Sequence, residues 1–376
     1  MLGYRINNSF FYNPYAAMVW AAHHHRHVFP DFCVYDDVFS ACDWTHDPVQ
    51  SWYELMKIRA TMLRQKYDRL ILAFSGGTDS ITCYGVFRDL NIHIDEILVT
   101  YSDDSLGNAP KENATWLIQN HYDPKTKITV WHRQDTSKFN YDRSDWYLSN
   151  HGDLRRFELT LPGPHTHDYL QETHGHTSWA LITGHEKPAL VYKNQRWWAT
   201  HLDGVYHAVM GWPNVEMFFV SPDLPELHIK QHHMLLSQIK TAGIKPTEGW
   251  NSLKDLGKNL LENYYWLATA CGRQIDITPG CSFNQKKYNQ HTKLQEADLL
   301  LSKKIISSPK IEPLLKSCLN HNDTLAKTYI NGWRDLHTDQ TLISYMTKHQ
   351  LLSHKNQTIN DYSQIWGKCY PLEQSS

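Results

Sequence analysis

The chain has 376 residues, enough for a catalytic domain and a second module, and its 41% hydrophobic and 20% charged residues exclude a largely disordered protein. Its net charge of −2 gives no overall attraction to nucleic acid. No apolar run reaches membrane-spanning length, the N-terminus lacks a secretory pattern, and seven cysteines without compact spacing favour a reducing compartment, so we expect a cytoplasmic protein.

Residues 1–65 are expected to form an N-terminal extension of short strands followed by a helix. Aromatic and turn residues alternate up to about residue 50, which is typical of short strands in irregular structure. Helical periodicity follows from Pro48 to Tyr67. The stripe of this predicted helix consists of Trp52, Leu55, Ile58 or Arg59, and Met62.

Residues 66–225 alternate strand and helix patterns. The predicted strands are short apolar runs at Leu70–Phe74, Glu96–Thr100, Lys127–His132 and Trp179–Thr183. The predicted helices between them are Ser80–Leu90 and Ala109–Asn120, the second with Pro110 in its first turn. This alternation predicts an α/β domain, a parallel sheet with helices on both faces.

Residues 226–376 follow helical periods and predict a helical C-terminal module. This part contains 18 Lys and Arg against 13 Asp and Glu, a local charge of +5. Such a charge favours contact with an anionic partner such as RNA, and a solvated helical surface is its more ordinary explanation.

The sequence SGGTDS, Ser75–Ser80, follows the first predicted strand of the α/β domain and leads into a helix. A helix N-terminus presents free backbone N–H groups, which bind anions. Gly76 and Gly77 allow the main chain to approach an anion closely, and the hydroxyls of Ser75, Thr78 and Ser80 are further donors. We therefore expect a phosphate site here.

Asp79 is the unusual residue of this loop, because a carboxylate repels phosphate groups. A magnesium ion between Asp79 and the phosphates would remove that conflict. The loop is not the P-loop of ordinary NTPases, since the pattern G-x-x-x-x-G-K-[ST] and its lysine are absent.

The loop resembles the PP-loop of the ATP pyrophosphatase superfamily, which has the adenine nucleotide alpha hydrolase-like fold. Its pattern Ser-Gly-Gly-x-Asp-Ser is matched by Ser75, Gly76, Gly77, Asp79 and Ser80. A chance glycine turn before a helix is the alternative interpretation. The resemblance implies an AMP-forming enzyme that binds ATP and Mg²⁺ and cleaves ATP between its α and β phosphates. It also implies that the end of the second strand, at Leu98, Val99 and Thr100, lies against the adenine.

A second loop, Thr183–Lys187, follows the fourth predicted strand. It is similar in outline to a loop of the synthetase domain of asparagine synthetases, where a Ser-Gly-Glu-Gly-x-Asp sequence reaches toward the phosphates and the acceptor. The resemblance implies that Gly184 contacts the nucleotide and that His185, Glu186 and Lys187 are catalytic. His185 would be an acid–base group, Glu186 would position metal or acceptor, and Lys187 would neutralise phosphate charge.

A third segment, Asn214–Leu227, is similar to the Val-Glu-x-Arg-x-Pro-Phe-Leu-Asp segment of the same family. Its matching residues are Val215, Glu216, Pro222 and Asp223. The arginine is absent, and the second loop has His-Glu-Lys in place of the acidic pattern. An ordinary strand and turn explain the segment equally well.

The branch of the superfamily remains open on sequence. Activation of a carbonyl for amide or C–N bond formation is one interpretation, without a glutaminase domain because Leu2 rather than cysteine follows Met1. A sulfur transferase acting on RNA is a second interpretation. In it Cys271 and Cys281 would relay sulfur, and the alternative is that both are buried structural cysteines. A non-catalytic nucleotide sensor is a third. The chain as a whole also resembles PP-loop proteins of large tailed phages, whose site of action would be the host cytoplasm.

The 24 histidines include three local clusters. They are His23, His24, His25 and His27; His165 and His167; and His174 and His176. A His-x-His pair on a strand would place both rings on one face and supply half of a zinc site. Polar surface histidines are the more ordinary interpretation, because no cysteine or carboxylate ligand is arranged nearby.

Overall fold

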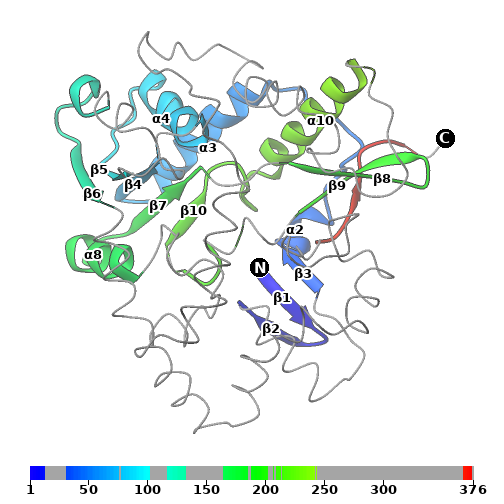
Figure 1. Ribbon diagram of the computed structural model, residues 1–376, viewed down its shortest axis with the longest axis horizontal. Coiled ribbons are helices and arrows are strands. Elements are labelled where there is room, and N and C mark those ends of the chain that lie inside the picture. The colour runs from blue at the N-terminus through cyan, green and yellow to red at the C-terminus, as the bar shows by residue number, and fades with distance from the viewer. Residues whose placement is uncertain are drawn as a thin grey trace, which may run out of the picture.

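The computed structural model describes residues 1–12, 31–75, 78–101, 117–132, 164–184, 188–201, 206, 209–212, 214–241, 243 and 367–374. Within them, five strands form a central parallel sheet, and two smaller antiparallel sheets lie to one side of it (Figure 1). No helix of the described residues is long and apolar enough to cross a membrane.

The central sheet has the strand order β10-β7-β4-β5-β6. Its strands are β4 (Arg69–Phe74), β5 (Glu96–Tyr101), β6 (Lys127–His132), β7 (Trp179–Thr183) and β10 (Val215–Met217). Every neighbouring pair is parallel. The expected α/β domain with a parallel sheet is therefore confirmed, and the four predicted strands are β4 to β7.

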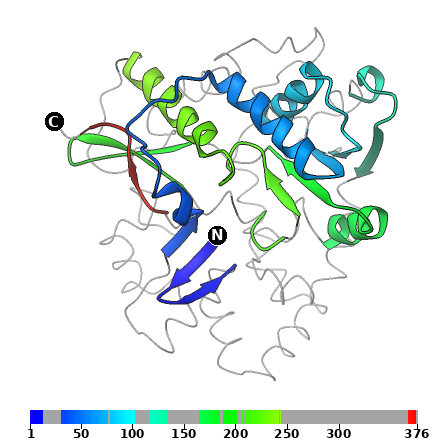
Figure 2. The ribbon, with the colours of Figure 1, turned by 180° about the vertical axis from the view of Figure 1, so that it is seen from behind.

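The two faces of the sheet have separate cores because alternate residues of a strand point to opposite sides. Leu70, Leu72 and Phe74 of β4 belong to the larger cluster with residues of α3 (Trp52–Lys66), α4 (Thr78–Asp89) and α10 (Pro225–Thr241). Ile71 and Ala73 face a smaller cluster with Leu170 of α8 (Pro164–His174). Figures 1 and 2 show α3, α4 and α10 along one side of the sheet and α8 apart from them.

Helix α3 begins at Trp52, because Ser51 and Glu54 form a reciprocal capping box. The helix was expected to begin near Pro48, so it begins about one turn later than predicted. Of the two alternatives for the apolar stripe, Arg59 is fully buried and Ile58 is exposed. The charged Arg59 can be buried because the carboxylates of Glu216 and Asp223 lie close to its guanidinium.

The N-terminal extension forms a sheet in the order β2-β1-β3, with β1 (Leu2–Ile6), β2 (Ser9–Phe11) and β3 (Asp31–Val34). A short helix, α2 (Asp36–Phe39), follows it. The predicted helix at 109–120 is described only at 117–120, which is helical.

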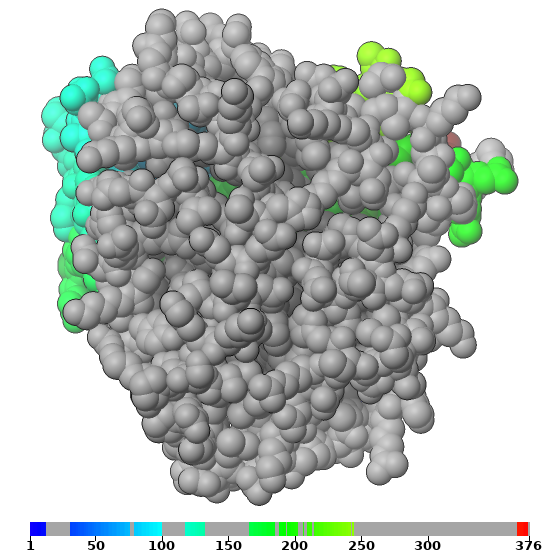
Figure 3. Space-filling model, viewed as in Figure 1, coloured from blue at the N-terminus to red at the C-terminus, as the bar shows by residue number. Residues whose placement is uncertain are grey.

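The third sheet, β11-β9-β8, was not predicted from the sequence. Strands β8 (Ala189–Lys193) and β9 (Arg196–Thr200) form a hairpin, and β11 (Tyr370–Pro371) brings residues near the end of the sequence onto β9. Figure 3 places this hairpin and the end of α10 on the opposite side of the molecule from the segment around β6. Of the predicted helical module, α10 is confirmed and most of the remainder, including Cys271 and Cys281, lies outside the described residues.

Candidate functional site

The candidate site lies where the order of strands reverses. Strand β4 has β5 on one side and β7, which comes later in the chain, on the other. In open parallel sheets such a switch point leaves a crevice at the carboxyl ends of the two strands, where ligands bind. The two predicted loops follow β4 and β7, so the topology brings both to this crevice.

The loop after β4 leads into α4, which begins at Thr78. Ser75 and Ser80 lie on either side of the loop, with their hydroxyl oxygens 3.3 Å apart. Ser75 is exposed, whereas Ser80 is buried in the first turn of the helix. Gly76 and Gly77 lie outside the described residues, as does the side chain of Thr78. Two of the predicted hydroxyl donors are therefore brought together at the helix N-terminus.

Asp79 occupies the first turn of α4 and is partly buried. Burial, together with the nearby charge of Asp79, raises the pKa of the Cys83 thiol well above its ordinary value. Cys83 therefore stays protonated in the core behind the loop and is unsuited to act as a nucleophile. Asp79 is the carboxylate of this loop that could meet a cation.

Gly184, the first residue after β7, lies directly against the beginning of α4. A β-carbon at this position would come within 2.9 Å of the carbonyl carbon of Asp79 and 3.1 Å of the backbone nitrogen of Ser80. Only glycine fits such an approach to backbone atoms without displacing them. The start of the second loop is thus packed against the main chain of the first turn of α4.

Thr183 precedes this glycine and was not predicted as a functional residue. Its side chain is fully buried, and its hydroxyl has no hydrogen-bond partner among the described residues. Its carbonyl accepts a hydrogen bond from the Phe218 amide at 2.9 Å. A buried hydroxyl without a partner is uncommon in folded proteins and marks a position where a bound group could satisfy it. The sequence feature that could have pointed to Thr183 is its position as the last residue of an apolar strand.

The other predicted site residues are placed as follows. Leu98 and Val99, which were expected to lie against the adenine, are fully buried in the cores on opposite faces of the sheet. The side chain of Thr100 lies outside the described residues. His185, Glu186 and Lys187 also lie outside them, between Gly184 and Pro188, both of which are described.

The segment at β10 has a structural role. Arg59 donates a hydrogen bond to Glu216 at 2.7 Å and lies 3.7 Å from Asp223, and Lys66 contacts both carboxylates at 2.9 and 3.0 Å. Burial favours the neutral form of Glu216, but the charge of Arg59 and hydrogen bonds from Tyr67, Lys66 and Arg59 outweigh it and lower its pKa. These carboxylates attach β10 to helix α3.

The predicted histidine pair belongs to a helix rather than a strand. His165 and His167 lie on α8, where residues two apart point in different directions. The His165 ring lies 4.6 Å from that of Trp131, and the His167 ring 5.8 Å from that of Trp212. The prediction that His165 and His167 form half of a zinc site on a strand is therefore wrong.

His174 and His176, the other clustered histidines that the structure describes, are not part of a metal-binding group of side chains. His174 donates a hydrogen bond to the buried Glu96 at 2.8 Å, and His176 is exposed. His23, His24, His25 and His27 lie outside the described residues. Among the residues that the structure describes, no three His, Cys, Asp or Glu side chains are grouped so as to hold a metal ion.

The arrangement offers backbone N–H groups to an anion at the N-terminus of α4, beside Gly184.

No protein-family model matches the chain, and no curated protein matches it.

Proposed function

We propose that the chain is an ATP-dependent adenylating enzyme that cleaves ATP to AMP and pyrophosphate to activate an acceptor carbonyl, in the manner of asparagine synthetases. The observation that carries this proposal is the contact of Gly184 with the Asp79–Ser80 peptide at the switch point of the sheet. A loop that must approach a helix N-terminus this closely shares its ligand site. The motif Ser75–Ser80 supplies the match to a pyrophosphate-binding loop.

The residues present fit magnesium bound together with ATP. Mg²⁺ in nucleotide enzymes is usually held by one or two carboxylates and by substrate phosphates rather than by a protein cage. Asp79 in the first turn of α4 provides one such carboxylate beside the anion site. Asp79 would hold the ion, which would supply neutralisation of the negative charge that grows on the leaving pyrophosphate.

In the proposed reaction an oxygen of the acceptor carboxylate attacks the α-phosphorus of ATP. The bond from that phosphorus to the bridging oxygen of the β-phosphate breaks, and pyrophosphate leaves. Ammonia or an amine then attacks the activated carbon, the bond from that carbon to the AMP oxygen breaks, and AMP leaves while the nitrogen loses a proton. Backbone N–H groups of α4 and the hydroxyls of Ser75 and Ser80 would hold the pyrophosphate throughout.

The second loop would serve the two transfers. Lys187 would meet charge on the departing phosphates, Glu186 would position the acceptor, and His185 would take the proton released from the attacking nitrogen. Gly184 supports these roles because it fixes the start of this loop against the phosphate site.

Isothermal calorimetry with Asp79→Asn tests the proposal. We expect MgATP to bind the wild-type chain and the variant to lose at least tenfold in affinity when Mg²⁺ is present. The matched control is Asp89→Asn at the other end of α4, which should bind MgATP as the wild type does. Equal affinity of the Asp79 variant and the wild type would remove the role of Asp79.

The identity of the products tests the chemistry. With ATP labelled at the α and γ positions, the enzyme and its acceptor should form AMP and pyrophosphate. ADP and orthophosphate as primary products would exclude an ATP pyrophosphatase. Binding of MgATP without turnover in the presence of cell extract would favour a nucleotide sensor instead.

A further inference from the structure

Residues 367–373, which we call the clasp, attach to three parts of the fold: strand β9, helix α2 and helix α10. Figure 1 shows the clasp in red, beside β9 and reaching α2. Its hydrogen bonds and ion pairs join Tyr370 to Asp36 (3.1 Å), Lys368 to Ser40 (2.7 Å), the Leu372 amide to the Trp197 carbonyl (3.0 Å) and Glu373 to Lys240 (2.7 Å). The clasp therefore bridges elements that are far apart in the sequence.

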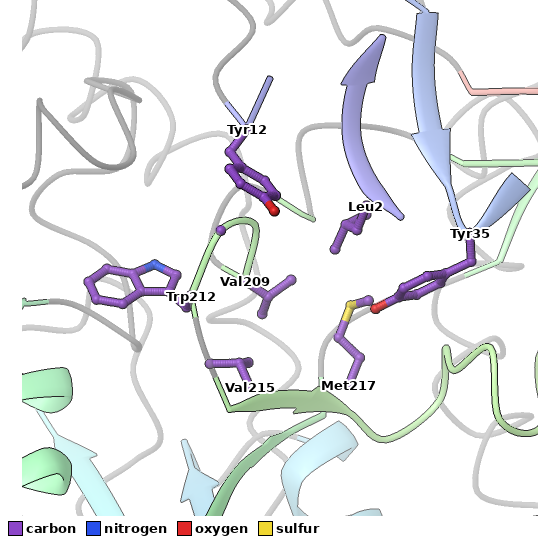
Figure 4. A pocket seen from close by; sticks show the side chains of 8 residues that line it. Leu2, Tyr12, Tyr35, Val209, Trp212, Val215 and Met217 are labelled. Atoms are coloured by element: carbon purple, nitrogen blue, oxygen red, sulfur yellow. The ribbon is translucent and has the colours of Figure 1, made fainter. Parts of the chain in front are cut away.

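The clasp also contributes to the attachment of the N-terminal sheet, because Gly367 forms a β-bridge with Phe32 of β3. Next to β10 the packing of this sheet is incomplete. A cavity of about 320 Å³ lies there, with Leu2, Tyr35 and Met217 among the residues that line it (Figure 4). The clasp is thus one of the places at which the N-terminal sheet is attached to the remainder of the chain.

Three histidine rings lie beneath the clasp: His201, His228 and His232, which we call the histidine cluster. The Tyr370 ring lies 6.3 Å from that of His201 and is stacked on Trp44 at 4.5 Å. The His228 ring lies 5.0 Å from that of His201 and 4.4 Å from that of His232. All three histidines are fully buried. The clasp therefore covers a group of titratable rings that have almost no contact with solvent.

The hydrogen bonds of these rings determine where a further proton has to add. His228 Nδ1 donates to Gln231 Oε1 at 3.1 Å, and His232 Nδ1 donates to the His228 carbonyl at 2.9 Å. A second proton on either ring must therefore go to Nε2. The Nε2 atoms of His228 and His201 are buried without a hydrogen-bond partner among the described residues. A buried charged donor without an acceptor is costly, so the cluster is stable while it is neutral.

Around the histidine cluster, the described residues offer a protonated ring no counter-charge. The titratable side chains packed against the rings or against their aromatic neighbours are Tyr206, Tyr370, His233, Asp36 and Lys368. The tyrosines are neutral in mildly acidic solution, and a charge on His233 opposes protonation of His232. Asp36, the carboxylate of this set, accepts the hydrogen bond of Tyr370 instead.

Burial accordingly lowers the pKa of His232 to about 4 and the pKa values of His201 and His228 well below 6.5. When the clasp opens and water reaches the rings, these pKa values return toward 6.5. Below pH 6.5 the open state then binds more protons, so the closed state is fully stable above pH 6.5 and weakens as the pH falls. A ring whose pKa changes from about 4 to about 6.5 favours opening about 30-fold more at pH 5 than at pH 7.5.

We propose that the clasp is an acid-released latch, in which proton uptake by the histidine cluster detaches residues 367–373 from β9 and α2 while the central parallel sheet stays folded. The proton enters at His201, because Tyr370 of the clasp lies against that ring. The clasp is joined to β9 by a strand of two residues, and none of the five strands of the central sheet pairs with it. This inference is independent of the proposed function.

Hydrogen–deuterium exchange of the full chain at pH 7.5 and pH 5.0, corrected for intrinsic exchange rates, tests the latch. We expect the protection of the amides of residues 367–373 to fall at least tenfold at pH 5.0 and that of β4 and β5 to stay unchanged. Equal protection of the clasp at the two pH values would overturn the inference. A loss of the same size in β4 would also overturn it, because the whole chain would then be unfolding.

Substitutions distinguish the histidine cluster from ordinary fraying of a short strand. His201→Asn removes the ring beneath the clasp, so most of the protection at pH 5.0 should remain, and His228→Asn replaces it if that variant does not fold. The matched control is His176→Gln, at an exposed histidine, which should keep the pH effect of the wild type. Tyr370→Phe removes the hydrogen bond to Asp36 and should loosen the clasp roughly fivefold at both pH values. A wild-type pH effect in a folded variant of the cluster would overturn the latch.

Discussion

Gly184, the first residue after β7, lies against Asp79 in the first turn of α4: a β-carbon on Gly184 would lie 2.9 Å from the carbonyl carbon of Asp79. Real β-carbons essentially never approach other atoms so closely. Only a residue without a side chain can therefore join the end of β7 to the N-terminus of α4 at this distance.

Gly184→Ala should push the residue after β7 away from the first turn of α4. We expect a loss of about 1–3 kcal/mol in unfolding free energy from overpacking, together with at least tenfold weaker MgATP binding, because the anion donors of α4 are displaced. Urea unfolding and calorimetry measure the two effects. Gly243→Ala is the control, since that glycine has a φ of 65° with open space around it, and its substitution strains the backbone away from the site. Unchanged MgATP affinity in a destabilised Gly184→Ala variant would contradict a shared ligand site.

Lys187→Met should lower turnover more than nucleotide affinity. In the proposed reaction Lys187 meets charge that grows only as pyrophosphate departs, so its removal should slow single-turnover AMP formation by about 10²-fold at saturating ATP. Thermal melts establish that the fold is intact. If Lys187 merely faces solvent, the rate should change by less than about twofold. A rate near that of the wild type would exclude a catalytic second loop.

The parallel sheet could be predicted from the sequence because its strands are buried on both faces. Such strands are short, continuous apolar runs, and Lys127–His132 and Trp179–Thr183 match the observed bounds of β6 and β7. The chain also carries a local signal at Ser75–Ser80, where a strand ends in small residues before a helix. What the sequence could not show was that Gly184 meets Asp79, because that contact depends on β7 returning beside β4.

The β8–β9 hairpin and helix α8 were missed for local reasons. Asn194 and Gln195 both have positive φ, 53° and 60°, as a two-residue hairpin turn requires, but Asn-Gln lacks the glycine that usually marks such turns. The α8 segment begins with Pro164 and is rich in histidine and polar residues, so its helical period was weak. His228 and His232 are four residues apart on α10, and His201 joins them only in the folded chain.

These three histidines form a neutral core cluster that predicts acid sensitivity. The ring of His228 lies 5.0 Å from that of His201 and 4.4 Å from that of His232, and all three are fully buried. Burial lowers the pKa of His232 to about 4 and the pKa values of His201 and His228 well below the ordinary value. The folded chain therefore binds fewer protons than the unfolded chain below pH 6.5, and stability is complete above pH 6.5 and falls as the pH drops.

For His232 alone the expected loss at pH 5 is about 2 kcal/mol of unfolding free energy relative to pH 7.5. Urea unfolding at the two pH values measures it, and His232→Gln should reduce the difference by about that amount. The control is His46→Gln at an exposed histidine, which should leave the pH dependence as it is in the wild type. An equal pH dependence in His232→Gln and the wild type would show that this cluster does not govern acid sensitivity.

The buried pair of Arg59 and Glu216 should hold β10 in place. The Arg59 side chain is 1% exposed, and its guanidinium donates to Glu216 at 2.7 Å and to the Met217 carbonyl at 3.2 Å. Removal of one partner leaves a buried charge uncompensated, which commonly costs about 3–5 kcal/mol. Glu216→Gln should therefore destabilise the chain strongly in urea.

Arg59→Met combined with Glu216→Gln should recover a large part of that loss, because no buried charge then remains at position 59 without its partner. The coupling free energy between the two substitutions distinguishes a paired buried charge from two independent surface contacts. Additive effects, or a cost below about 1 kcal/mol for Glu216→Gln, would show that the outer carboxylate of Asp223 alone satisfies Arg59. In that outcome β10 would be held in place by packing rather than by the buried ion pair.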